Sequence, residues 1–320
     1  MYLFHHDYPF DPSYGYNSLH DLFAVQPPAP PADFAEYWRK RYRKTLAFAT
    51  DYEVVGGGNQ GGYLTFDIFY RSTGGVTISG WLLIPEDQPV YQAIIVGHGY
   101  GGRDEPDYHL NIPGAALLFP CFRGLARSRF ANLSENPEQH VLYGIEHPDN
   151  YILGGCIEDL WVAVTVIQQM LPQVRHQIGY MGISFGGGIG ALATPWDHRI
   201  KRAHFNVPTF GHQPLRLLLP TIGSAAALQS YDRQQPYHVI DTLSYYDAAS
   251  AARFARQPAH FALATFDPVV APPGQFAIYN TWAAEKHYYL LEAGHFDYPN
   301  KIVQEQQLLE ELKQFFGEVS

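Results

Sequence analysis

The sequence predicts an α/β fold with a mostly parallel central sheet and helices on both faces. Short, almost continuously apolar runs recur along the chain, as in strands that are covered on both faces. Longer segments with apolar residues at helical spacing alternate with these runs. The chain has 320 residues, and α/β folds of this length often form one unit. We therefore expect a single domain over residues 1–320.

Residues 1–50 are predicted to form an N-terminal arm and a helix. The proline-rich run at residues 27–31 cannot be helical, so we expect an extended arm that lies on the body of the protein. Asp33 stands three residues before Glu36, the spacing of a capping box, and predicts the start of a helix that runs to about Phe48.

The rest of the chain is predicted to alternate between strands and helices. Residues 63–70 and 76–84 flank a glycine pair and predict an antiparallel hairpin. Between two later core strands, polar and helical sequence at about residues 212–256 interrupts the alternation of strands and helices. This interruption predicts a lid-like insertion that forms a pocket wall. The remaining strands are expected at 93–96, 115–119, 178–183, 260–266 and 288–291, and the helices at about 151–170, after 183 to 193, 275–284 and 300–316.

Composition and charge exclude several classes of function. The net charge of −10 argues against nucleic-acid binding, which needs a basic face. The N-terminus does not resemble a signal peptide, and no segment approaches about 20 unbroken apolar residues, so we expect a cytoplasmic protein without a membrane partner. Cys121 and Cys156 lie in apolar segments and are interpreted as buried packing residues. Residues 5–7 (His-His-Asp) are compact, but the motifs of a metal site are missing, so neither a metal nor a cofactor is predicted.

The motif Gly-Ile-Ser-Phe-Gly at residues 182–186 stands between a predicted strand and a predicted helix. This context is that of the nucleophile elbow of the α/β-hydrolase fold, in which a sharp turn lifts a serine hydroxyl above the sheet. Ser184 is therefore the candidate nucleophile. The alternative is a glycine-rich turn of purely structural importance.

A serine nucleophile needs a base within reach and an acid that orients the base. His295 follows a predicted core strand, at the edge of the sheet where catalytic groups gather, and is the candidate base. Asp267 directly follows another such strand and is the candidate acid. Asp297 is the competing acid, although it stands only two residues from the histidine.

Ester hydrolysis also needs an oxyanion hole, in which backbone N–H groups face the developing negative charge. The N–H of Phe185, directly after the nucleophile, is one candidate, and the N–H of Tyr100 in the glycine-rich loop 97–102 is the other. His98 in the same loop is interpreted as structural. A phosphate cradle is the alternative for these glycines, but the accompanying lysine and helix motifs are missing.

Four stretches of the chain resemble the acetyl xylan esterase and cephalosporin C deacetylase family of α/β-hydrolases, carbohydrate esterase family seven. They are residues 31–38, 78–85, 97–102 and 267–280, and the last resembles the acid loop of the family and its following helix. The resemblance implies Ser184, Asp267 and His295 as the catalytic triad. It also implies Tyr100 and the residue after the serine as oxyanion donors.

Three positions depart from the family pattern. Phe185 and Leu125 stand where the family usually has glutamine, and Phe296 stands where it usually has glutamate. The first change keeps the backbone N–H that the oxyanion hole needs. Because all three changes replace a polar with an apolar residue, they bear on the specificity for acetylated sugars and on the hexameric assembly that the resemblance implies. A homo-oligomer is accordingly left open.

Together these observations predict a serine esterase that removes short acyl groups, above all acetyl, from a small substrate such as a sugar. Tyr100 and Phe210 are expected to crowd the pocket and to limit the acyl group to a short one. Two alternatives stay open: a peptidase or lactonase on the same fold, and a catalytically retired binding protein.

Overall fold

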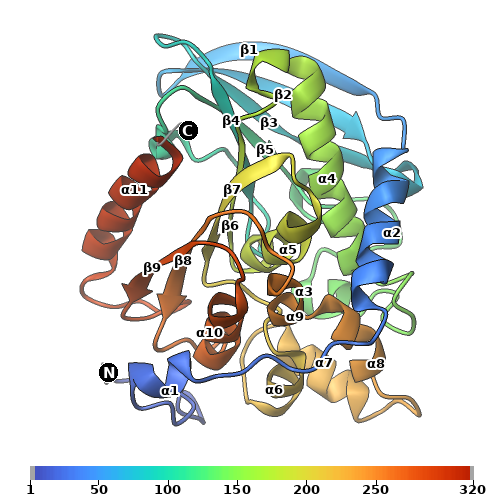
Figure 1. Ribbon diagram of the computed structural model, residues 1–320, viewed down its shortest axis with the longest axis vertical. Coiled ribbons are helices and arrows are strands. Elements are labelled where there is room, and N and C mark those ends of the chain that lie inside the picture. Colours follow the sequence, from blue (N-terminus) through green and yellow to red (C-terminus); the bar gives the residue numbers. More distant parts are fainter. Residues whose placement is uncertain (1–3, 318–320) are drawn as a thin grey trace.

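The computed structural model describes residues 4–317, and its centre is a twisted mixed sheet (Figure 1). Within these residues nine strands lie in the order β1-β2-β3-β5-β4-β6-β7-β8-β9. The three pairings from β1 to β5 are antiparallel, and the five from β5 to β9 are parallel. The strands are β1 (Tyr52–Gln60), β2 (Tyr63–Arg71), β3 (Thr77–Pro85), β4 (Gln92–Gly97), β5 (Ala115–Pro120), β6 (Ile178–Ile183), β7 (Ile200–Asn206), β8 (Ala259–Ala264) and β9 (Lys286–Leu291).

Helices cover both faces of this sheet, which confirms the predicted fold class. Helices α2, α4, α5 and α10 lie on one face and α11 lies on the other, while α6 to α8 gather at the carboxyl ends of the parallel strands (Figure 1). The helices are α1 (Leu19–Phe23), α2 (Phe34–Leu46), α3 (Pro137–His140), α4 (Ile152–Met170), α5 (Phe185–Ala193), α6 (Gln213–Leu218), α7 (Ala225–Asp232), α8 (Ile240–Leu243), α9 (Ala248–Ala252), α10 (Pro272–Thr281) and α11 (Lys301–Gly317).

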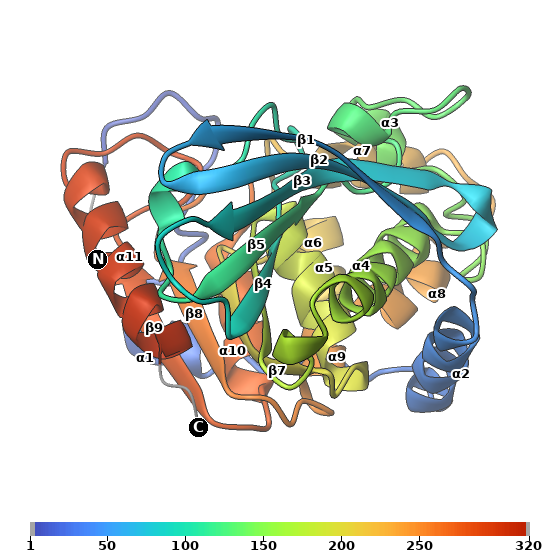
Figure 2. The same cartoon turned by 90° about the horizontal axis from the view of Figure 1, so that it is seen from above.

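The two faces of the sheet bury two separate apolar clusters. Successive residues of a strand point to opposite faces, so Ile95 packs toward α4 and α5, whereas Ile94 packs toward α11. The central strands are buried along their whole length, which explains their continuous apolar runs in the sequence. Figure 2 shows the same arrangement from above, with α11 and α4 on opposite sides.

Strands β1 and β7 are absent from the sequence predictions. All nine residues of β1 are exposed, and its pairing with β2 shifts between Val55 and Gly58, so the strand has neither an apolar run nor regular alternation. Strand β7 begins Ile-Lys-Arg and lies between β6 and β8, and polar residues interrupt its apolar pattern. Both strands form because neighbouring strands supply their backbone hydrogen bonds.

The predicted capping box at the start of α2 is wrong. Asp33 is the N-cap residue, but its side chain makes no capping hydrogen bond. Instead its carboxylate accepts a hydrogen bond of 2.7 Å from the hydroxyl of Tyr245. A tertiary contact from the inserted segment therefore replaces the local one. Helix α10 also begins earlier than predicted, at Pro272, because two prolines fit the first turn of a helix.

Within residues 4–317, α4 is long and apolar enough to cross a membrane by length and composition. Most of its side chains are buried inside the protein, between α2, α5 and the strands β4 and β5. Packing in the core explains this composition. Cys121 and Cys156 are likewise buried and unbridged, as predicted.

Candidate active site

The turn between β6 and α5 has the strained geometry of a nucleophile elbow. Ser184 has φ 53° and ψ −110°, a conformation that costs an L-residue roughly 1–3 kcal/mol. The turn is held by hydrogen bonds from Ser184 N–H to the Asn206 carbonyl (2.8 Å) and from Thr209 N–H to the Ser184 carbonyl (3.1 Å). A Cβ atom at Gly186 would lie 2.7 Å from the backbone of Gly97, so only glycine fits there.

The structure brings the three predicted side chains into one hydrogen-bonded chain. His295 Nε2 lies 2.9 Å from Ser184 Oγ, and His295 Nδ1 lies 2.8 Å from Asp267 Oδ2. The competing acid, Asp297, is not part of this chain, because its side chain is exposed and forms an ion pair with Lys301 at 3.5 Å.

Asp267 is fully buried and held from several sides. Its Oδ1 accepts hydrogen bonds of 2.9 Å from the backbone N–H groups of Val269 and Val270, and Oδ2 accepts one of 3.1 Å from Gln275. These donors compensate the charge of an ionised carboxylate and fix the oxygen that faces His295. Gln275 is not among the predicted site residues, although it belongs to the stretch that resembles the acid loop of the family.

The pKa of His295 is raised from its ordinary value of 6.5. Burial by itself favours the neutral ring, but the charge of Asp267 and its hydrogen bond to Nδ1 outweigh this effect. The Asp267 carboxylate accepts a hydrogen bond from the Nδ1–H of His295, which leaves the lone pair of Nε2 toward Ser184 when the ring is neutral. Because the side chain of His295 is 23% exposed, solvent reaches the ring.

The backbone N–H groups of Phe185 and Tyr100 are the two predicted oxyanion donors. Phe185 is the first residue of α5, and Tyr100 lies in the loop after β4. Among residues 4–317 neither N–H donates a hydrogen bond within the protein. The Gly186 N–H donates to the His98 carbonyl at 2.9 Å, which fastens this loop to the elbow.

His98 has the structural place that the sequence analysis assigns to it. It is buried, and its Nε2 accepts a hydrogen bond of 3.0 Å from the Phe122 N–H, while Nδ1 lies 2.7 Å from the Gly99 carbonyl. Burial lowers the pKa of His98 to about 4, so the ring is neutral. The histidine thus joins the loop after β4 to the loop after β5.

The side chain of Phe185 is fully buried in a cage of rings. Its centroid lies 4.2 Å from that of Tyr100, 5.6 Å from that of Phe122 and 5.9 Å from that of Phe210. The ring of Tyr100 is further held by a hydrogen bond of 3.0 Å between its hydroxyl and His140 Nδ1. The apolar residue at this position therefore supports the loop that carries the Tyr100 N–H.

Ser184 opens into a cavity of about 280 Å³. Tyr100 and Phe210, the two residues expected to crowd the pocket, both line it, together with residues of α6, α7 and the acid loop. Phe210 has φ 71° and His212 has φ 56°, so the segment between β7 and α6 is strained where it forms this wall. A volume of this size suits a small ligand.

The N-terminal arm contacts the acid loop, which sequence reasoning did not predict. The Asp267 N–H donates to the Pro12 carbonyl at 3.1 Å, and the Tyr14 hydroxyl donates to the Asp267 carbonyl at 3.3 Å. The ring of Phe4 lies 5.4 Å from that of Phe296, beside His295. The arm therefore contacts both loops that carry Asp267 and His295.

A model of the acetyl xylan esterase family matches residues 18–313. The chain belongs to the acetyl xylan esterase family. Membership makes it a serine carboxylic ester hydrolase and confirms the resemblance seen in the sequence.

Solved structures show the same fold. An acetyl xylan esterase from Paenibacillus sp. R4 is 24% identical, with 92% of this chain and 99% of that chain covered and a TM-score of 0.78. Acetyl xylan esterase 1 from Thermoanaerobacterium sp. JW/SL YS485 is 21% identical over 92% of this chain and 98% of that chain, with a TM-score of 0.79. An acylaminoacyl peptidase from Pyrococcus horikoshii is 14% identical over 80% of this chain and 41% of that chain, with a TM-score of 0.64.

Proposed function

We propose that this esterase removes acetyl and other short acyl groups from small sugar-type substrates, such as acetylated xylan fragments, through an acyl-enzyme. Family membership supports the substrate class. The cavity of about 280 Å³ supports the restriction to small groups. The continuous chain of hydrogen bonds from Ser184 to Asp267 is the observation that carries the reaction type.

In the proposed reaction, Ser184 Oγ attacks the acyl carbon while His295 Nε2 takes its proton. The buried carboxylate of Asp267 holds the ring and stabilises its charged form. The N–H groups of Tyr100 and Phe185 bind the oxygen that becomes negative. The imidazolium then protonates the leaving alcohol. A water molecule, deprotonated by the same imidazole, hydrolyses the acyl-enzyme and releases the acid.

Substitution of the nucleophile tests this assignment. We expect Ser184→Ala to lower kcat on 4-nitrophenyl acetate at least about a thousandfold, because the hydroxyl forms the acyl-enzyme. Initial rates with acetate, butyrate and octanoate esters measure both the loss and the acyl preference, which should fall with chain length. Ser244→Ala, in the inserted segment outside the cavity, is the matched control and should keep wild-type rates. Retention of activity by Ser184→Ala to within about tenfold would contradict the proposal.

A further inference from the structure

A charged side chain lines the cavity into which Ser184 opens. Arg216 lies on α6, in the segment inserted between β7 and β8, and forms part of the same wall as Phe210. Its guanidinium carbon lies 5.1 Å from the centre of the Phe210 ring. Its hydrogen bonds go to Gln213 Oε1 at 3.4 Å and to Ser224 Oγ at 3.1 Å. Both partners are neutral, so they do not balance the positive charge.

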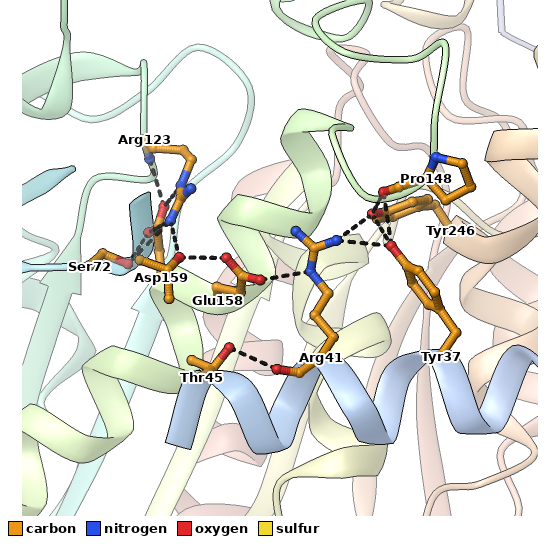
Figure 3. A network of polar contacts seen from close by, with 10 residues as sticks. Tyr37, Arg41, Thr45, Ser72, Arg123, Pro148, Glu158, Asp159 and Tyr246 are labelled. Carbon is orange, nitrogen blue, oxygen red and sulfur yellow. Dashed lines mark hydrogen bonds and ion pairs between the residues drawn. The ribbon is translucent and has the colours of Figure 1, made fainter. Parts of the chain in front are cut away.

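No aspartate or glutamate among residues 4–317 forms an ion pair with Arg216, although Glu138 lines the same cavity. The arginines of the core differ in this respect. Arg41 pairs with Glu158 at 2.8 Å, and Arg123 pairs with Asp159 at 2.6 Å (Figure 3). The pKa of Arg216 also shifts in the opposite direction to the pKa values of Arg41 and Arg123. Burial lowers the pKa of Arg216, whereas Tyr246 and then Glu158 beside Arg41, and Asp159 beside Arg123, outweigh burial and raise the pKa of those two arginines.

An arginine side chain remains protonated in proteins, so Arg216 carries its charge into the cavity. Arg216 is partly buried. A charge that is partly withdrawn from water without an anionic partner is unfavourable, and an anion that enters the cavity reduces this cost. The planar guanidinium matches the two oxygens of a carboxylate. Arg216 is the single cation among the described residues that line this small, largely apolar cavity, which suits a monoanion better than a phosphate dianion.

We propose that Arg216 binds a carboxylate of the substrate while the ester group lies at Ser184. The inference rests on the proposed function and adds to it a preference for acylated substrates that carry a negative charge. The carboxylate belongs either to the alcohol part, as in an acetylated uronic acid, or to the acyl chain, as in a dicarboxylic half-ester. Both present the same group to the guanidinium.

Two matched pairs of substrates separate these sources. For the alcohol part, the methyl glycoside of 2-O-acetylglucuronic acid, which has a free carboxylate, is compared with methyl 2-O-acetylglucoside, in which CH₂OH replaces the carboxylate. For the acyl chain, monomethyl succinate is compared with its neutral amide, methyl succinamate. The quantity measured is the ratio of kcat/KM for the charged substrate to kcat/KM for its neutral partner, at low and high salt.

We expect the wild-type ratio to exceed about ten in one pair, as for a hydrogen bond to a charged group. Arg216→Gln should reduce this ratio to about one or less, and Arg216→Lys should retain part of it. Arg233→Gln removes an exposed charge at the end of α7 and should keep the wild-type ratio. High salt should lower the ratio in the wild type.

The inference would be overturned by wild-type ratios near one in both pairs, or by a ratio that Arg216→Gln leaves unchanged. In either case, turnover that depends on Ser184 would still support the proposed function. Absence of Ser184-dependent turnover for all four substrates would overturn both the inference and the proposed function.

An inhibition experiment on the wild type does not depend on the folding of the variants. In the wild type, glucuronate or succinate should inhibit hydrolysis of a neutral ester at lower concentrations than glucose or succinamide, and equal inhibition within both pairs would count against the inference.

Discussion

At the scale of single residues, Asp267 determines how His295 is oriented and how readily its ring is protonated. The carboxylate is buried, accepts three hydrogen bonds from its own loop and from Gln275, and faces His295 Nδ1. Its charge raises the pKa of His295 above 6.5 against the effect of burial. In the proposed reaction His295 must be neutral to accept the proton of Ser184, so we expect activity to be lost as the pH falls through the pKa of His295.

We therefore expect kcat/KM to fall toward acid with a midpoint above pH 6.5, the ordinary pKa of histidine. Asp267→Asn should move this midpoint to lower pH, because only burial then acts on the ring, and should lower kcat by about 10⁴. A pH series of kcat/KM on 4-nitrophenyl acetate measures both effects. Asp297→Asn, the exposed neighbour, is the control. An unchanged midpoint in Asp267→Asn would show that another group titrates.

Phe185 combines two properties in one residue. Its backbone N–H is the proposed oxyanion donor, and its side chain fills the cage formed by Tyr100, Phe122 and Phe210. We expect Phe185→Ala to lower the free energy of unfolding by about 3–5 kcal/mol, the usual cost of removing a buried phenyl ring. Urea denaturation measures the loss. Phe130→Ala, at a ring that is 39% exposed, should cost far less, and equal losses would contradict the packing argument.

At the scale of elements, a buried ion pair joins α4 to the loops after β2 and β5. Asp159 on α4 is fully buried and accepts hydrogen bonds from Ser72 Oγ and from the backbone and side chain of Arg123 (Figure 3). Next to it, Glu158 pairs with Arg41 of α2. These contacts hold Arg123 in the loop after β5, and His140 Nε2 lies 3.0 Å from the Arg123 carbonyl.

We expect Asp159→Ala to lower the free energy of unfolding by about 3–5 kcal/mol, because it leaves the Arg123 charge buried without its partner. The matched control is Asp51→Ala, whose partner Arg71 is 53% exposed, and which should cost no more than about 1 kcal/mol. Urea denaturation of the two variants gives the comparison. The double variant Asp159→Ala with Arg123→Met should recover part of the loss, and no recovery would mean that the pair itself is unimportant.

At the scale of the whole molecule, the N-terminal arm packs against the two loops of the site that come late in the sequence. Residues 4–14 lie against the acid loop and the loop of His295, and α1 packs beside α10 (Figure 1). Asn280 at the end of α10 donates to the carbonyls of Leu22 and Val25, which holds the arm in place. The arm thus supports the catalytic loops from outside the sheet.

Removal of residues 1–14 should lower kcat by about tenfold or more and reduce the midpoint of thermal unfolding. Asp267 then loses its backbone contacts with Pro12 and Tyr14, and small displacements of catalytic groups have large effects on rate. Tyr14→Phe removes one of these contacts and should show a smaller effect in the same direction. A truncated protein with wild-type kcat and thermal midpoint would show that the arm is dispensable.

Local sequence patterns are enough to predict the central strands and the candidate site residues of this protein. Continuous apolar runs marked the central strands, because both faces of those strands are covered. The motif around Ser184 located the elbow, since only glycines fit its close backbone approaches. Asp267 and His295 could be selected because each follows a strand, and the carboxyl ends of parallel strands meet at one edge of the sheet.

Tertiary structure decided what depends on contacts between distant segments. Strand β1 exists because β2 pairs with it, and the Asp33 carboxylate turns from its own helix to Tyr245. The place of Arg216 in the cavity wall follows from how the inserted segment folds over the sheet. That Arg216 forms no ion pair among the described residues follows from its three-dimensional contacts and not from the sequence around it. Sequence spacing specifies neighbours along one element, whereas burial and charge balance depend on all the elements that pack together.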